Sequence, residues 1–122
     1  MVKTILIADD EPNQIATLQA LLTERGYTVL TAFNGEQAVA KATQAQPDLV
    51  ILDIMMPKMD GTEVAMILKN DMRTRHIPIF FVTAMISPED QVSTRNNPNL
   101  ILAKPVKLYE LLEAIRKAVP QG

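Results

Sequence analysis

Short apolar runs alternate along the chain with stretches whose apolar residues are spaced as on one face of a helix. The runs are rich in Val, Ile and Leu and show little polar alternation, which is typical of strands buried on both faces of a parallel sheet. We predict five such strands, at Ile5–Ala8, Val29–Phe33, Leu49–Leu52, Ile79–Val82 and Leu100–Ala103.

Helical spacing follows most of these runs. Gly26 is expected to stop the first helix, and the second should begin after Asn34, a favourable N-cap residue, and end before Pro47. Alternating strands and helices indicate consecutive βα units, and so an α/β fold of the (βα)5 type, a doubly wound five-stranded parallel sheet with helices on both faces. The apolar stripes consist of Ile15, Leu18, Leu21 and Leu22; of Ala38, Val39 and Ala42; of Val64, Ile67 and Leu68; and of Leu108, Leu111, Leu112, Ile115 and Val119.

The stretch SPEDQVSTRNNPN, residues 87–99, departs from this pattern. Ser87 and Pro88 form a good helix start, but Val92 is the only apolar residue before the segment ends. We predict a short, weakly packed and mobile helix here. An ordinary surface helix anchored by Ile86 and Val92 is an equally weighted alternative.

Composition narrows the classes of function. The chain has 122 residues, 48% of them hydrophobic and 21% charged, as in a single globular domain. A net charge of −2 does not favour binding to nucleic acid phosphates, and the absence of cysteine excludes disulfides, thiolate metal sites and a Cys nucleophile. The N-terminal apolar run is too short for a signal peptide or a membrane span, so we expect a cytoplasmic protein without direct membrane or nucleic acid binding.

Polar residues occupy the carboxyl ends of four predicted strands. Asp9 and Asp10 end the first, Asp53 the third, Thr83 the fourth and Lys104 the fifth. Ligands of open α/β sheets bind at this edge, so three carboxylates would converge there if the first strand lies beside the third. Such a cluster needs a cation, and hard oxygen ligands favour Mg²⁺. Taken alone, each of these residues is better explained as a helix cap or a loop residue. Their occurrence together at one edge of the sheet favours a binding site.

Four motifs resemble those of the receiver domain of two-component response regulators, the CheY-like family. They are LIADDEP (residues 6–12), DLVILDIMMPKMDG (48–61), FVTA (81–84) and LAKP (102–105). The resemblance extends from Val2 to about Val119. It implies a flavodoxin-like fold with strand order 2-1-3-4-5, and commonly a cis peptide bond before Pro105.

The resemblance also implies roles for the polar residues. Asp53 would accept a phosphoryl group from a phosphohistidine and become an aspartyl phosphate. Asp10 and Asp53 would bind Mg²⁺ directly, Asp9 directly or through water, and the main-chain carbonyl of Met55 would complete the protein ligands. Thr83 and Lys104 would contact phosphoryl oxygens. Such a protein is a signalling phosphoacceptor, which catalyses only its own phosphotransfer and autodephosphorylation, rather than a classical enzyme.

The partners implied are a sensor histidine kinase or a histidine phosphotransfer protein, and a downstream protein target or a linked output domain; a homodimer is a further option. Residues 1–122 are expected to form a single receiver domain with no output domain in this chain. Whether the receiver stands alone or belongs to a longer protein stays open. In the family, positions 55 and 85 border the path of the water that removes the phosphoryl group, and both are Met here.

One departure from the family concerns switching. Ile101 stands where many receivers carry Tyr or Phe, so the aromatic partner of Thr83 is missing. We therefore expect phosphorylation to act through residues 86–99. A pseudo-receiver that serves as a phosphorylation-independent docking module is the main alternative. A dehalogenase-type phosphatase would need an acid at Met55, and a nucleotide-binding domain would need a glycine-rich loop after the first strand.

Overall fold

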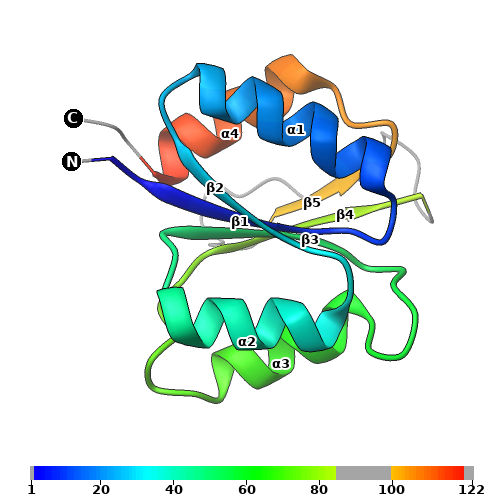
Figure 1. Ribbon diagram of the computed structural model, residues 1–122, viewed down its shortest axis with the longest axis vertical. Helices are drawn as coiled ribbons and strands as arrows, with labels where there is room; N and C mark the ends of the chain where they lie inside the picture. Colours follow the sequence, from blue (N-terminus) through cyan, green and yellow to red (C-terminus); the bar gives the residue numbers. More distant parts are fainter. Residues whose placement is uncertain (1, 85–99, 120–122) are drawn as a thin grey trace.

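The computed structural model describes residues 2–84 and 100–119, which form a parallel sheet covered by helices on both faces (Figure 1). The strand order is β2-β1-β3-β4-β5, as predicted. The strands are β1 (Thr4–Ala8), β2 (Thr28–Ala32), β3 (Leu49–Asp53), β4 (Ile79–Thr83) and β5 (Leu100–Ala103). The helices are α1 (Pro12–Glu24), α2 (Gly35–Ala45), α3 (Gly61–Lys69) and α4 (Leu108–Ala118). The helix predicted within residues 87–99 lies outside the described residues.

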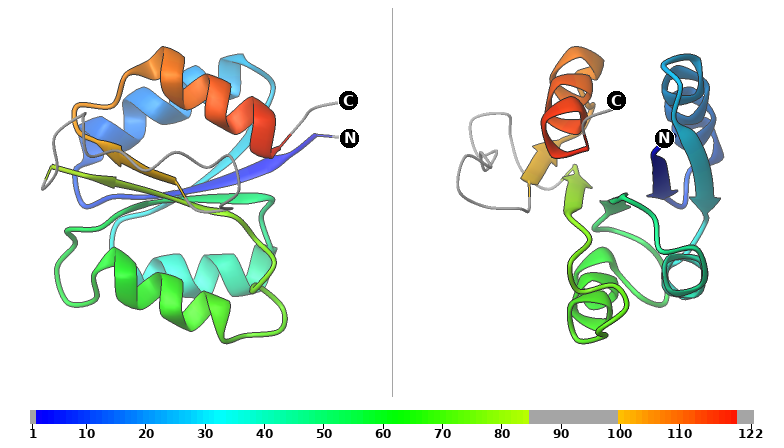
Figure 2. Two further views of the ribbon diagram at one scale, coloured as in Figure 1. Left: turned by 180° about the vertical axis from the view of Figure 1, so that it is seen from behind. Right: turned by 90° about the vertical axis from the view of Figure 1, so that its left-hand side faces the viewer.

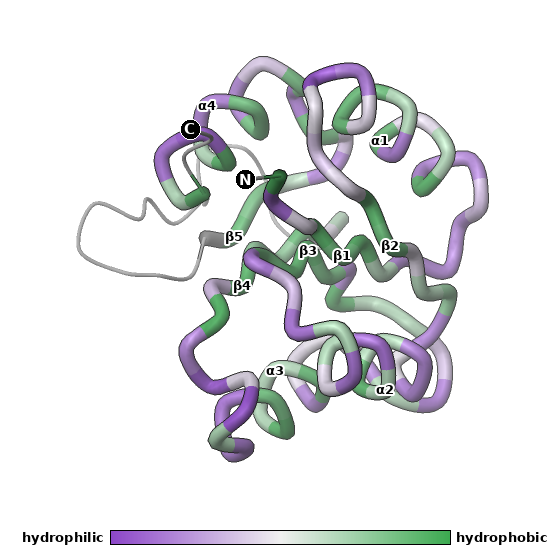
Figure 3. The backbone as a smooth tube through the Cα atoms, turned by 60° about the vertical axis from the view of Figure 1, so that its left-hand side comes forward, coloured by the Kyte–Doolittle hydropathy of each residue, from purple (hydrophilic) through white to green (hydrophobic). Residues whose placement is uncertain are grey.

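The three layers of the fold are separated most clearly in the side view of Figure 2, where α1 and α4 lie on one face of the sheet and α2 and α3 on the other. Alternate residues of a strand point to opposite faces, so each central strand contributes to two cores. Ile5 and Ile7 pack with α1 and α4, whereas Leu6 and Ala8 pack with α2 and α3. The apolar residues of β1 and β3 are almost fully buried, which explains their near-continuous hydrophobicity (Figure 3).

The helix boundaries follow from local capping. Asn34 is the N-cap of α2, and its side-chain oxygen accepts a hydrogen bond from the Gln37 N–H at 2.8 Å, as predicted. Asp60 caps α3 in the same way, accepting from the Glu63 N–H at 3.0 Å. Gly26, with φ of 96°, follows the end of α1. The Lys104–Pro105 peptide bond is cis, as expected.

Two features differ from the sequence predictions. The strand predicted at Val29–Phe33 is not buried on both faces: β2 is an edge strand paired only with β1, its central residues are half-buried, and Phe33 lies beyond its end with 44% exposure. Two residues of the predicted helical stripes are also exposed, Ile67 at 41% and Leu108 at 39%; on α3 the buried residues are Gly61, Val64 and Leu68. None of the helices within residues 2–84 and 100–119 is long and apolar enough to cross a membrane.

Candidate functional site

The carboxyl edge of the sheet brings together the polar residues singled out in the sequence. Asp53 and Thr83 are the last residues of β3 and β4, and both side chains are buried. Asp9 and Asp10 follow β1 directly, and Lys104 follows β5. The Asp9, Asp10 and Asp53 carboxylates each have an oxygen within 4.8 Å of the others. This convergence results from placing β1 beside β3, because β1 then ends next to Asp53.

Lys104 neutralises part of this acidic cluster. Its Nζ lies 3.0 Å from Asp9 Oδ2 and 3.2 Å from Asp53 Oδ2, and all three side chains are largely buried. The Lys104 N–H also donates to the Thr83 carbonyl at 2.8 Å, which fixes the start of the lysine segment against β4. The contact with Asp9, the shorter of the two, is not predicted by the sequence and is revealed only by the three-dimensional arrangement.

The electrostatics of the cluster disfavour a metal-free carboxylate at position 53. Burial raises the pKa of Asp53, and the negative charge of Asp9 raises it further, while Lys104 and the Met55 N–H oppose the shift without cancelling it. Burial alone would lower the pKa of Lys104, but its contacts first with Asp9 and then with Asp53 raise it. Ionised, the three carboxylates exceed the single ammonium by two negative charges, so a divalent cation would balance the site.

Asp9 and Asp10 occupy different environments. Asp9 is buried, and its carboxylate accepts from the Glu11 N–H at 3.0 Å as well as from Lys104. Asp10 is exposed, and within the described part of the chain its carboxylate makes no hydrogen bond or ion pair. Glu11 occupies the N-cap position of α1 without a side-chain capping bond. Asp53 is as buried as Asp9, and both of its carboxylate oxygens also accept hydrogen bonds, from the Met55 N–H and from Lys104. Of the three carboxylates, that of Asp10 is therefore the most accessible to a cation.

The loop between β3 and α3 is held close to the cluster by glycines. A Cβ atom on Gly61 would lie 2.5 Å from the Asp53 carbonyl oxygen, so only glycine allows α3 to begin this close to β3. A Cβ on Gly35 would likewise lie 2.5 Å from the Met59 carbonyl oxygen, which brings the start of α2 against the same loop. Within the loop, the Met55 N–H donates to Asp53 Oδ1 at 3.1 Å, so the backbone of residue 55 is oriented directly by Asp53.

Lys58 is strained in this loop. The Met59 N–H donates to the Pro57 carbonyl at 2.8 Å, closing a γ-turn in which Lys58 has φ of 69°. A residue with a side chain at positive φ costs roughly 1 kcal/mol or more. The Lys58→Gly variant is therefore expected to be more stable than Lys58→Ala, with a free energy of unfolding about 0.5–1 kcal/mol higher. Urea denaturation of the two variants measures the difference. An Ala variant as stable as the Gly variant would contradict the strained turn.

Thr83 lies beside β5, the strand that carries Ile101. Thr83 pairs in register with Ala103, and Phe81 pairs with Ile101, which is half-buried on β5. No aromatic ring therefore lies at position 101 to respond to Thr83. The expectation that switching acts through residues 86–99, and the role of Met85, concern residues outside the described ranges and stay predictions.

Comparisons with known proteins agree with this geometry. A profile for the response regulator receiver domain matches residues 5–116. Protein PilH of Pseudomonas aeruginosa is 39% identical over 112 residues, which cover 91% of this chain and 93% of PilH. The response regulator PleD of Caulobacter vibrioides is 38% identical over 113 residues, or 92% of this chain, but the chain spans only 25% of PleD. Among solved structures, the receiver domain of the sensor histidine kinase PA1611 from Pseudomonas aeruginosa superimposes with a TM-score of 0.82 at 25% identity, covering 99% of this chain and 100% of that one.

A five-stranded parallel sheet in the order β2-β1-β3-β4-β5, with three carboxylates at its carboxyl edge, is the flavodoxin-like arrangement of CheY-type receiver domains. The chain belongs to the response regulator receiver domain family of two-component systems. Members of this family are signalling phosphoacceptors that bind Mg²⁺ in an acidic pocket and interact with histidine kinases and downstream effectors. This chain has such a pocket in Asp9, Asp10 and Asp53.

Proposed function

We propose that this domain accepts a phosphoryl group on Asp53 from a phosphohistidine of a sensor histidine kinase or a histidine phosphotransfer protein. In this step the phosphorus–nitrogen bond of the phosphohistidine breaks, a bond forms between phosphorus and an Asp53 carboxylate oxygen, and the leaving imidazole takes up a proton. The observation that carries the proposal is the position of Asp53 at the end of β3, between two further carboxylates and the Lys104 ammonium.

The donor set fits Mg²⁺. Three carboxylates within 4.8 Å of one another offer hard oxygen ligands, and their mutual repulsion is not fully offset by Lys104. Asp10 and Asp53 would hold the ion directly, with Asp9 contributing directly or through water and the Met55 carbonyl as a further ligand. When bound, Mg²⁺ would offset the repulsion between the nucleophile and the incoming phosphoryl group. The PA1611 receiver domain, whose described structure has a magnesium ion coordinated in its active site cleft, supports this assignment.

Lys104 and Thr83 would serve the phosphorylated state. Lys104 Nζ already contacts Asp53 Oδ2, so a small movement would let it pair with a phosphoryl oxygen once Asp53 is modified. Thr83 ends the neighbouring strand, from which its hydroxyl would donate to a second phosphoryl oxygen. The phosphorylated surface would then bind a downstream protein target or a linked output domain. We place this activity in the cytoplasm, where the phosphohistidine donor would be available.

Exposure to a small phosphodonor tests the proposal. Incubation with acetyl phosphate and Mg²⁺ is expected to add one phosphoryl group per chain, as measured by intact mass, and EDTA is expected to prevent the addition. A protein that gains no mass with acetyl phosphate, phosphoramidate or a phosphorylated histidine phosphotransfer protein would instead support a docking module that works without phosphorylation.

The lifetime of the phosphorylated state is expected to depend on Met55, whose side chain is 55% exposed beside the cluster. A thioether accepts hydrogen bonds only weakly and cannot orient an attacking water, whereas its apolar length can hinder entry of water. Met55→Asn combined with Met85→Glu should speed autodephosphorylation about ten-fold, equivalent to about 1.4 kcal/mol of barrier. Phosphate release from purified phosphoprotein measures the rate.

Met66→Asn is the matched control for this prediction, because it makes the same substitution at an exposed methionine on α3, away from the cluster. Its phosphate release should follow the wild-type rate. Equal or slower release from the double variant would show that the methionines do not limit access of water.

A further inference from the structure

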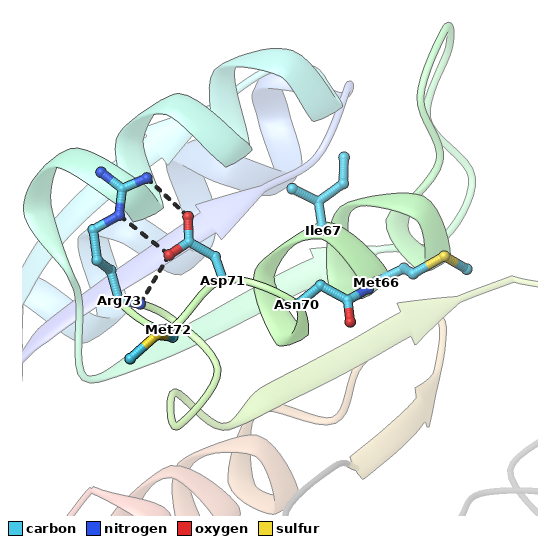
Figure 4. Close-up of a pocket in the computed structure, with 6 residues that line it drawn as sticks. All are labelled: Met66, Ile67, Asn70, Asp71, Met72 and Arg73. Atoms are coloured by element: carbon cyan, nitrogen blue, oxygen red, sulfur yellow. Dashed lines mark hydrogen bonds and ion pairs between the residues drawn. The ribbon is translucent and has the colours of Figure 1, made fainter.

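A second surface with binding character lies at the far end of α3 from the acidic cluster. Met66 and Ile67 project from the last turns of α3, and Met72 lies on the turn that follows, with exposures of 64%, 41% and 78% (Figure 4). Asn70, Asp71 and Arg73 complete the lining of the same groove. We call this surface the α3 patch. Exposed methionines make adaptable apolar contacts and are over-represented on protein-binding surfaces.

The α3 patch is held in shape by hydrogen bonds between α3 and the turn. Buried Thr74 donates through Oγ1 to the Leu68 carbonyl at 2.7 Å, and Lys69 Nζ donates to the Ile77 carbonyl at 2.9 Å. Asp71 accepts from the Arg73 backbone N–H and forms an ion pair with its guanidinium, both at 2.8 Å. A groove fixed in this way loses little conformational entropy when a partner binds.

The charge around the α3 patch selects the chemistry of its partner. Residues 66–76 contain three cations (Lys69, Arg73 and Arg75) and one anion (Asp71), a net charge of +2 in a chain whose total is −2. Arg75 and His76 are exposed at the side of the turn. An acidic partner would therefore be attracted here and repelled by much of the remaining surface.

We propose that the α3 patch binds an acidic amphipathic helix of a partner protein, with apolar side chains on Met66, Ile67 and Met72 and carboxylates toward Arg73 and Arg75. This surface is separate from the acidic cluster, and the proposal does not depend on phosphorylation. A lipid surface fits less well, because stable binding to anionic membranes takes a larger group of basic residues. A symmetric dimer through this face would bring the basic turns of two copies together.

A designed peptide probes this surface directly. The probe is an 18-residue, end-capped peptide with Leu at helical spacing and Glu at the remaining positions. A scrambled peptide of the same composition and a Leu/Lys peptide serve as controls. Of the three peptides, we expect only the Leu/Glu peptide to shift the amide signals of residues 66–76 in NMR spectra of the ¹⁵N-labelled chain. These shifts should become smaller as the salt concentration is raised.

Substitutions decide whether the α3 patch is responsible. The double variant Met66→Gln, Met72→Gln should raise the dissociation constant of the peptide at least about ten-fold, and Arg75→Glu should raise it several-fold. Tyr109→Gln, a change at a side chain on α4 as exposed as Met72, should leave the dissociation constant unchanged. The proposal is overturned by equal binding of the Leu/Glu peptide to all variants, or by equal binding of the Leu/Lys peptide. Binding to anionic phosphatidylglycerol vesicles without peptide binding, or self-association abolished by the Met substitutions, would also overturn it.

Discussion

Asp10→Asn is expected to make phosphorylation by acetyl phosphate about 100-fold slower or more and, at the same time, to raise the stability of the metal-free protein. The first effect follows from loss of an accessible carboxylate in the cluster that would hold Mg²⁺. The second follows from relief of repulsion among Asp9, Asp10 and Asp53; it should stay below about 1 kcal/mol, because Asp10 is exposed. Intact mass and thermal melts in EDTA measure the two effects.

Glu11→Gln provides the control for Asp10→Asn. Glu11 is the exposed neighbouring acid, and its carboxylate is not part of the cluster. This variant removes the same charge one residue away and should retain both the rate of phosphorylation and the stabilisation by Mg²⁺. If Asp10→Asn were less stable than the wild type in EDTA, Asp10 would be a structural residue of the α1 start rather than a metal ligand.

Lys104→Met is expected to have the opposite effect on the metal-free fold, lowering its free energy of unfolding by about 2 kcal/mol. Removing the ammonium leaves Asp9 and Asp53 buried without their shared partner, and breaking such a buried pair is costly. The same change should tighten Mg²⁺ binding, because Nζ no longer occupies the oxygens of two acidic residues. Chemical denaturation in EDTA and calorimetric titration with Mg²⁺ test both effects.

The pH dependence of this loss has a defined sign. Burial and Asp9 already raise the pKa of Asp53 in the folded protein, and removal of Lys104 should raise it further. When folding raises the pKa of a carboxyl group, the folded protein becomes less stable as the pH rises from the unfolded-state pKa to the folded-state pKa. The loss of stability in Lys104→Met should therefore be largest at neutral pH and shrink on acidification. Lys107→Met, at an exposed lysine on the same segment, should show neither effect. Unchanged stability or weaker Mg²⁺ binding in Lys104→Met would contradict this account.

The parts of the fold that local patterns determine could be predicted from the sequence. The apolar runs identify β1, β3 and β4 because these strands are largely buried on both faces, and Asn34 marks the start of α2 because its side chain satisfies a free N–H group. The polar residues at the strand ends could be grouped in advance because parallel strands end at one edge. The strand order itself came from the family resemblance and was confirmed by the structure.

Features that depend on tertiary packing could not be predicted in the same way. The exposure of Phe33 and Ile67 follows from the edge position of β2 and the orientation of α3, which apolar spacing does not encode. The Lys104–Asp9 contact joins residues that follow β5 and β1, two strands that are not neighbours in the sheet. The requirement for glycine at position 35 arises from the Met59 carbonyl, which the sequence separates by more than 20 residues but the fold brings into contact.

Direct identification of the modified residue tests the central claim most sharply. After incubation with acetyl phosphate and Mg²⁺, borohydride reduces an aspartyl phosphate to homoserine, which peptide mass spectrometry can locate. We predict homoserine at position 53 in the wild-type protein, none in an EDTA control, and no modification of Asp53→Asn. Homoserine at position 9 or 10 instead, or the same mass gain in Asp53→Asn as in the wild type, would contradict the assignment of Asp53 as the phosphoacceptor.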